Sequence, residues 1–263
     1  MRNPGGKNYT LGSGKLYFAM FALGTQNPQG YRYFGNTPEF TTSSDHEDLD
    51  HFDSDNGQRF KDDSVTLTNS SSGAFTTDNI SLENVAMYYL GDVSSYTQLA
   101  ATAQTETITV QKGRYYQLGV TQANPAGTRH VNNVTFKIAA VAFPILNNIE
   151  LDLPTGRFYV EDSAPGITGT TVDLIVSYDQ LAYTQDRVIS KNNSIVGALF
   201  FEATTKKGIK FDYTWPYVKI SPDGDYNLKS MEDWSAMSFT VELLQKSGYE
   251  TVYITSRGIP AVV

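Results

Sequence analysis

The sequence predicts an all-β protein: a mainly antiparallel β-sandwich or barrel of about a dozen strands, with one short α-helix packed on it. Apolar and polar residues alternate with period two in one segment after another, and clusters of Gly, Pro, Asn and Asp separate these segments. The aromatic residues, 13% of the chain, are mostly Tyr and Phe, which suit a half-buried pleated surface. Because all-β domains often run to about 200–250 residues, we expect a single domain over residues 1–263.

The predicted strands follow one another with short turns between them. In "SFTVELLQ", alternation places Phe239, Val241 and Leu243 on one face, and Thr240 and Glu242 on the other. The same pattern predicts strands, in chain order, at residues 14–21, 64–68, 113–121, 133–141, 156–162, 171–179, 195–204, 209–215, 238–245 and 251–255.

One segment, "SLENVAMYYLG", has helical spacing instead. Its apolar residues at three- and four-residue intervals are Leu82, Val85, Ala86, Tyr89 and Leu90. Ser81 can cap the start, Glu83 favours the first turn, and Gly91 is expected to provide the left-handed stop. We therefore expect a single short helix lying against the sheets.

The stretch "SSDHEDLDHFDSDNGQRFKDD", residues 43–63, interrupts the strand pattern with eight carboxylates and two of the three histidines of the chain. It is predicted to be a long polar loop, extending over about residues 40–64. Structureless segments of this length inside a domain are usually functional or disordered.

Composition excludes several classes of function. The net charge of −8 argues against a protein that grips nucleic acid through its phosphates, which requires clustered Lys and Arg. Without cysteine there is no disulfide framework and no thiolate metal site. The first residues lack the apolar core of a signal peptide and no apolar run approaches a membrane span, so we expect synthesis in a cytoplasm and no membrane partner.

Motifs for metal binding and catalysis do not fit. If Gly57 were the glycine of a calcium loop, the first ligand position would fall on Phe52, which has no oxygen to offer. His46 and His51 are five residues apart, a spacing that does not put both rings on one helical face. No Gly-x-Ser-x-Gly elbow is present, and "LGSGK" lacks the first glycine of a phosphate loop. We expect no catalytic residue, no metal and no cofactor.

Two readings stay open at this point. The aromatic residues from Phe211 through Tyr213 and Trp215 to Tyr217 form either a sugar-stacking platform or core and cross-strand pairs. Two carboxylates of a glycoside hydrolase are the other possibility, because their separation in space does not follow from the sequence.

An ordered series of motifs resembles the major tail tube protein of long-tailed bacteriophages. The motifs are "GKLYFAMF", "RYFGNTPEF", "LDHFDSDNGQRFKDDSVTLT", "GAFTTDNISLENVAMYYLG", "TGRFYVED", "VISKNNSIVGALFFEA" and "WPYVKISPDGDYNLKSMEDWSAMSFTVELLQK". The resemblance spans nearly the whole chain and depends on the order of the motifs. The density of Asp around Asp53 and Asp55 departs from it.

The resemblance implies a β-sandwich subunit of the virion tail that assembles six to a ring. The rings would stack into a hollow tube through which genomic DNA passes without tight binding. It also implies that the long loop reaches a neighbouring subunit. Further partners would be the tape measure, tail terminator and distal tail proteins, with assembly in the host cytoplasm.

On this basis residues 43–63 are expected to form an assembly arm. Leu49, Phe52 and Phe60 would supply apolar anchors. Arg59 and Lys61 would pair with acids on an adjacent subunit. The alternative is a solvated loop with local charge pairs.

A structural protein without enzymatic activity is thus the leading prediction. The alternative functions are a carbohydrate- or receptor-binding β-sandwich module and a hydrolase with two catalytic carboxylates. A binding module would expose an aromatic platform, whereas a hydrolase would need a cleft with a perturbed acid.

Overall fold

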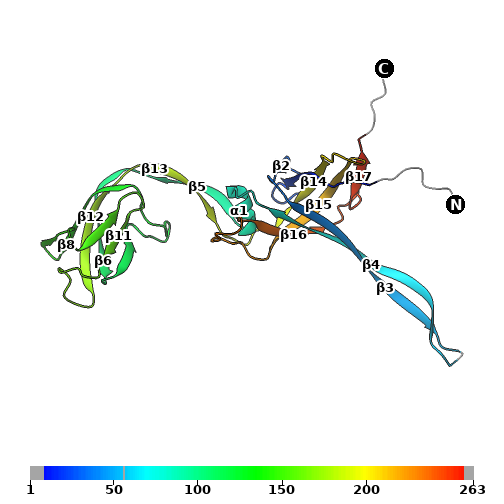
Figure 1. The fold of residues 1–263 in the computed structure, drawn as a ribbon, viewed down its shortest axis with the longest axis horizontal. Coiled ribbons are helices and arrows are strands. Elements are labelled where there is room, and N and C mark those ends of the chain that lie inside the picture. The colour runs from blue at the N-terminus through cyan, green and yellow to red at the C-terminus, as the bar shows by residue number, and fades with distance from the viewer. Residues whose placement is uncertain (1–8, 56, 258–263) are drawn as a thin grey trace, which may run out of the picture. The chain divides into compact units, whose positions relative to one another are not determined.

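The protein is all-β with one short helix, as predicted. A computed structural model describes residues 9–55 and 57–257, and within these residues the chain forms seventeen strands and one helix (Figure 1). The sheets are antiparallel, and none of those described closes into a barrel. The predicted domain span also includes residues 1–8, 56 and 258–263, which lie outside the described residues.

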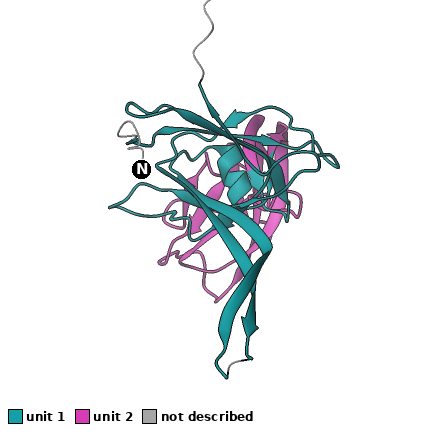
Figure 2. Cartoon of the chain, turned by 90° about the vertical axis from the view of Figure 1, so that its right-hand side faces the viewer, with its two compact units in different colours: residues 1–93, 188–263 teal, residues 94–187 magenta. Residues whose placement is uncertain are grey.

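The chain forms two compact units with separate cores (Figure 2). Unit 1 consists of Met1–Val93 and Val188–Val263, and unit 2 consists of Ser94–Arg187. We expected one domain over residues 1–263, whereas unit 2 is inserted between two parts of unit 1. The sequence gives no sign of this division because composition does not change at either boundary.

Unit 1 is built on one large sheet. Its strands, in spatial order, are β2 (Arg32–Tyr33), β1 (Gly14–Met20), β14 (Ile195–Ala203), β15 (Phe211–Asp223), β16 (Met237–Leu243), β4 (Phe60–Thr77) and β3 (Glu39–Asp53). In addition, β17 (Tyr253–Ser256) pairs with the start of β15. The order leaves β2 and β3 as the outer strands of this sheet.

The core of unit 1 lies on one face of this sheet. Phe239, Val241 and Leu243 of β16 are buried there, whereas Thr240 and Glu242 are exposed, which confirms the predicted alternation. The ring of Phe239 stacks on Phe75 of β4 at 5.1 Å between centroids, and Phe75 contacts Phe34 at 4.7 Å.

Helix α1 (Leu82–Tyr88) packs on this core, and the Ser81 hydroxyl caps it by accepting a hydrogen bond from the Asn84 amide, as predicted. The predicted role of Gly91 was wrong, because Leu90 is the residue with positive φ (50°). The Leu90 amide donates to Met87 and the Gly91 amide to Ala86, a Schellman pair of hydrogen bonds. Glycine is needed at 91 for space, since a Cβ would lie 2.2 Å from the Ile189 carbonyl oxygen.

Unit 2 contains a small sandwich of two sheets. One sheet has the order β6 (Ala101–Val110), β12 (Val172–Gln180), β8 (Val131–Ile138) and β9 (Val141–Phe143). The other has the order β10 (Ile149–Asp152), β11 (Arg157–Val160) and β7 (Arg114–Gln117). Leu174, Phe136 and Phe158 come from both sheets and share one buried cluster.

The chain leaves and re-enters unit 1 along a two-stranded sheet. It is formed by β5 (Asp92–Gln98) and β13 (Tyr183–Ile189). Both boundaries of unit 2 fall within these two strands. A paired connection of this kind replaces the Gly- and Pro-rich linkers that usually reveal a domain boundary in a sequence.

Candidate functional site

Strands β3 and β4 extend beyond the large sheet as a two-stranded ribbon, which we call the arm and define as residues 45–70 (Figure 1). Next to the sheet, β4 pairs with both β3 and β16, up to the pair Ser71–Leu243. Farther out, the arm strands are paired only with each other among the residues described.

The arm corrects our prediction of a polar loop over residues 43–63. Its Asp-rich strand pairs because hydroxyl groups on β4 face the carboxylates. Thr66 donates to Asp48 (2.7 Å), and Ser64 donates to Asp50 (2.8 Å). Asp is disfavoured in strands, and these cross-strand hydrogen bonds to the carboxylate oxygens offset that preference.

One face of the arm exposes apolar side chains among charged ones. Leu49 lies directly opposite Val65 in the register, so both side chains point to the same face. Alternation along β3 places His51 and Asp53 on that face as well, and Phe60 lies opposite Asp53, beyond a register irregularity that follows His51. The exposed fractions are 61% for Leu49, 57% for Val65 and 58% for Phe60. A two-stranded ribbon has no core in which these three side chains could be buried.

The other predicted arm residues already have partners within the arm. The Arg59 guanidinium lies over the Phe52 ring, 4.3 Å from its centroid. The Lys61 ammonium is 2.6 Å from a carboxylate oxygen of Asp50. Pairing of Arg59 and Lys61 with acids of another subunit therefore stays a prediction, and would require these local contacts to open.

The contact between Lys61 and Asp50 predicts a measurable titration. The hydrogen bond from Lys61, followed by that from Ser64, lowers the pKa of Asp50 below its ordinary value. Because the pKa of Asp50 is lower in the folded state, its ionised carboxylate stabilises the arm at pH values above the ordinary aspartate pKa of about 3.9. This contribution is lost as the pH falls through the lowered pKa. In Lys61→Met, carboxyl NMR should show the Asp50 pKa rising towards normal; an unchanged pKa would contradict the pairing.

The two arm histidines form separate contacts. His51 Nδ1 lies 2.6 Å from Asp62, while His46 Nε2 lies 3.7 Å from Asp48. Among the residues described, no group of three or more His, Asp and Glu side chains is placed to hold a metal ion.

The aromatic residues at 211–217 belong to the packing of unit 1. Trp215 is 3% exposed, and its ring stacks on Tyr213 and meets Phe40 edge to face. Tyr217 lies beyond a register irregularity in β15 and contacts Phe21. Phe211, at the start of the segment, is 37% exposed. The core and cross-strand reading is therefore confirmed for Tyr213, Trp215 and Tyr217, and the platform reading is wrong for these three residues.

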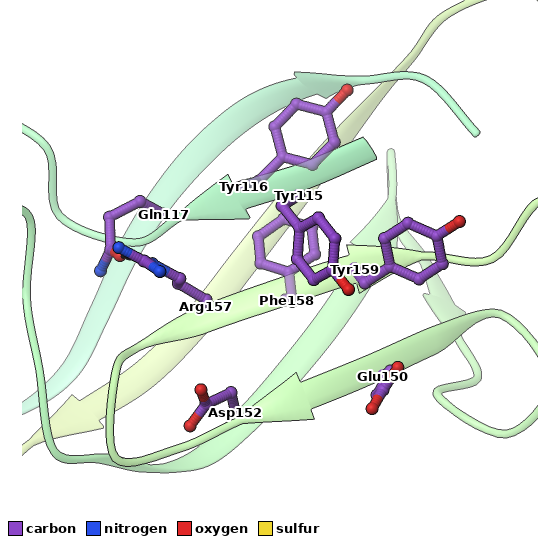
Figure 3. A pocket seen from close by; sticks show the side chains of 8 residues that line it. All are labelled: Tyr115, Tyr116, Gln117, Glu150, Asp152, Arg157, Phe158 and Tyr159. Atoms are coloured by element: carbon purple, nitrogen blue, oxygen red, sulfur yellow. Dashed lines mark hydrogen bonds between the residues drawn. The ribbon is translucent and has the colours of Figure 1, made fainter. Parts of the chain in front are cut away.

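A concave surface that sequence reasoning missed lies on the outer face of β10, β11 and β7 in unit 2 (Figure 3). It is a hollow of about 550 Å³, and its exposed wall contains Tyr115, Tyr159 and Arg157. The alternation in "GRYYQ" and "GRFYVED" was visible in the sequence. The pairing of these segments, which are about forty residues apart, was not.

The fold and these surfaces define an all-β protein of two units with a projecting acidic arm. The chain belongs to the family described as "Protein of unknown function UCP028589", whose model matches residues 9–251. No curated protein matches the chain. Within its described residues, no helix is both long and apolar enough to span a membrane.

Proposed function

We propose that this chain is a structural protein that assembles into six-membered rings stacked as a hollow tube, through which DNA passes. The order of motifs that resembles phage tail tube proteins supports this proposal, and the exposed apolar side chains of the arm, Leu49, Val65 and Phe60, carry it. On this proposal the protein resides in the virion tail, assembles in the host cytoplasm and catalyses no reaction.

The arm is better suited to contact a second copy than to stand alone. An isolated two-stranded ribbon is marginally stable in water because it buries little surface. Covering Leu49, Val65 and Phe60 would remove apolar area from water at about 25 cal/mol per Å². A neighbouring subunit that receives this face would order the arm and close the ring.

The outer strands of the large sheet offer further contacts to a neighbouring subunit. Outer strands carry unpaired backbone groups that can pair with another chain. The outer strand β3 is long, but its carboxylates repel one another and discourage unspecific pairing. A head-to-tail contact that uses these margins closes into a ring when its rotation allows.

The charge of the chain fits a conduit. DNA carries about one negative charge per 1.7 Å of helix axis, so a basic lining would hold it by counterion release. A protein with a net charge of −8 has no such excess of cations, and DNA can slide past it. The tape measure, tail terminator and distal tail proteins are the partners that this role would require.

Negative-stain microscopy of the purified protein at high concentration tests the proposal. We expect annuli of six subunits and tubes built from them, with light scattering after gel filtration showing the corresponding masses. A protein that stays monomeric at high concentration would overturn the tube. Tubes whose inner surface binds duplex DNA tightly would overturn the conduit.

A further inference from the structure

The outer face of the three-stranded sheet in unit 2 carries an ordered grid of side chains (Figure 3). The register places them in two cross-strand rows of three: Tyr115, Tyr159 and Glu150, followed by Gln117, Arg157 and Asp152. The alternate residues, such as Phe158, are buried in the sandwich core. Each of the six side chains therefore stands on a strand that the core holds in place.

The aromatic end of the grid is open. The rings of Tyr115 and Tyr159 pack against each other, with centroids 4.6 Å apart and planes tilted by 40°. Tyr115 is 72% exposed, whereas the Tyr159 hydroxyl donates to Asp162 (3.1 Å), which fixes the second ring. The exposed ring of Tyr115, backed by the anchored ring of Tyr159, is a platform on which an apolar face can stack.

The polar end of the grid is held in position by local hydrogen bonds. Arg157 Nε donates to the Gln117 side-chain oxygen at 3.0 Å. Asp152 accepts from the Thr155 amide at 3.3 Å, and hydrogen bonding from the Thr155 side chain and then from its amide lowers the pKa of this carboxyl. Fixed acceptors and donors beside an apolar platform are the arrangement that orients a small ligand.

We propose that this grid binds a neutral saccharide. A pyranose ring has an apolar C–H face that stacks on the tyrosines and a rim of hydroxyls that act as both donors and acceptors. Carboxylates at Glu150 and Asp152 accept from such hydroxyls, and Arg157 donates to them. Because two carboxylates and only one guanidinium line the hollow, a sulfated or uronic saccharide would be repelled.

Unit 1 contains a comparison for this geometry. Tyr17 and Tyr33 also form a cross-strand pair, with centroids 5.4 Å apart, but Tyr17 donates to Glu202 and the pair does not line the hollow of unit 2. Tyr33 is 44% exposed. It therefore serves as a matched control for the loss of one exposed tyrosine from a cross-strand pair.

Affinity electrophoresis of the full chain in gels that contain dextran, xylan or galactomannan tests the site, with alginate and heparin as anionic probes. We expect retardation by at least one neutral polysaccharide and by neither anionic one. Tyr115→Ala should weaken the interaction about tenfold or more, while Tyr33→Ala should bind like the parent chain.

Glu150→Gln provides a second test that does not depend on the platform, and it should also weaken binding, since a charged acceptor forms the stronger hydrogen bond. If Tyr115→Ala does not fold, as judged by circular dichroism, Glu150→Gln decides the result. No retardation by any neutral polysaccharide, preference for an anionic one, or equal binding by Glu150→Gln would overturn the proposal. The result is independent of tube formation, because binding is measured on the chain in any oligomeric state.

Discussion

Replacing Leu49 and Phe60 with serine is expected to abolish rings and tubes while leaving a folded monomer. Both side chains are about 60% exposed in the isolated chain, so their loss removes little packing from the subunit. Burial of a side chain of this size contributes about 1.5–3 kcal/mol. Because only about 60% of each residue is still exposed, losing both at each contact between subunits would weaken that contact at least about twentyfold.

Leu228→Ser with Met231→Ser is the matched control. These residues are 74% and 99% exposed and lie between β15 and β16 in the same unit. The control removes two exposed apolar groups without touching the arm, and it should form tubes like the parent chain. Microscopy and gel filtration with light scattering report both variants. Normal tubes from the Leu49 and Phe60 variant would show that the arm is not an assembly contact.

Much of the strand pattern was readable from the sequence because alternation is local. Phe239 and Val241 face the core and Thr240 faces away, as period two requires. Helix α1 was readable for the same reason, since Ser81 and the apolar spacing that follows it lie within a few residues. Its end was misread because both Leu90 and Gly91 fit a Schellman motif, and only the approach of Ile189 shows what the glycine is for.

The arm was misread because its strand propensity is not local. Asp48 and Asp50 are unfavourable in a strand until Thr66 and Ser64 stand opposite them. That pairing depends on the register of two segments that are separated by a turn. The two Asp residues that depart from the tail tube resemblance do not belong to this cross-strand ladder: the Asp53 carboxylate accepts a hydrogen bond from the Asp55 amide near the turn.

For the candidate surfaces too, the sequence predicted what depends on neighbouring residues and missed what depends on residues far apart in the chain. The sequence predicted that Leu49 and Phe60 would be available, and both are exposed. It could not assign Trp215 to the core rather than to a platform, because that depends on Phe40, a residue far away in the chain. The grid around Tyr115 needs three strands from different parts of unit 2, so no single segment could reveal it.

Separate cores predict that each unit can be destabilised by itself, with a large effect. Phe136 in unit 2 is 2% exposed and meets Phe158 edge to face, while Phe239 in unit 1 is fully buried against Phe75. Phe→Ala at either position leaves a cavity and is expected to cost about 3–5 kcal/mol. Such a loss is a large part of the stability of a domain.

Amide hydrogen exchange distinguishes the two units. In Phe136→Ala, the free energy of exchange of the β8 and β12 amides should fall by the whole loss of unfolding free energy, while the protection of β14 and β16 is retained. In Phe239→Ala, the protection of β14 and β16 should fall and that of β8 and β12 should be retained. Thr240→Ala, at an exposed position of β16 next to Phe239, is the control and should change neither. If either Phe variant lowered protection equally in both units, the chain would unfold as one cooperative body, and the two cores would be parts of a single domain as the sequence alone suggested.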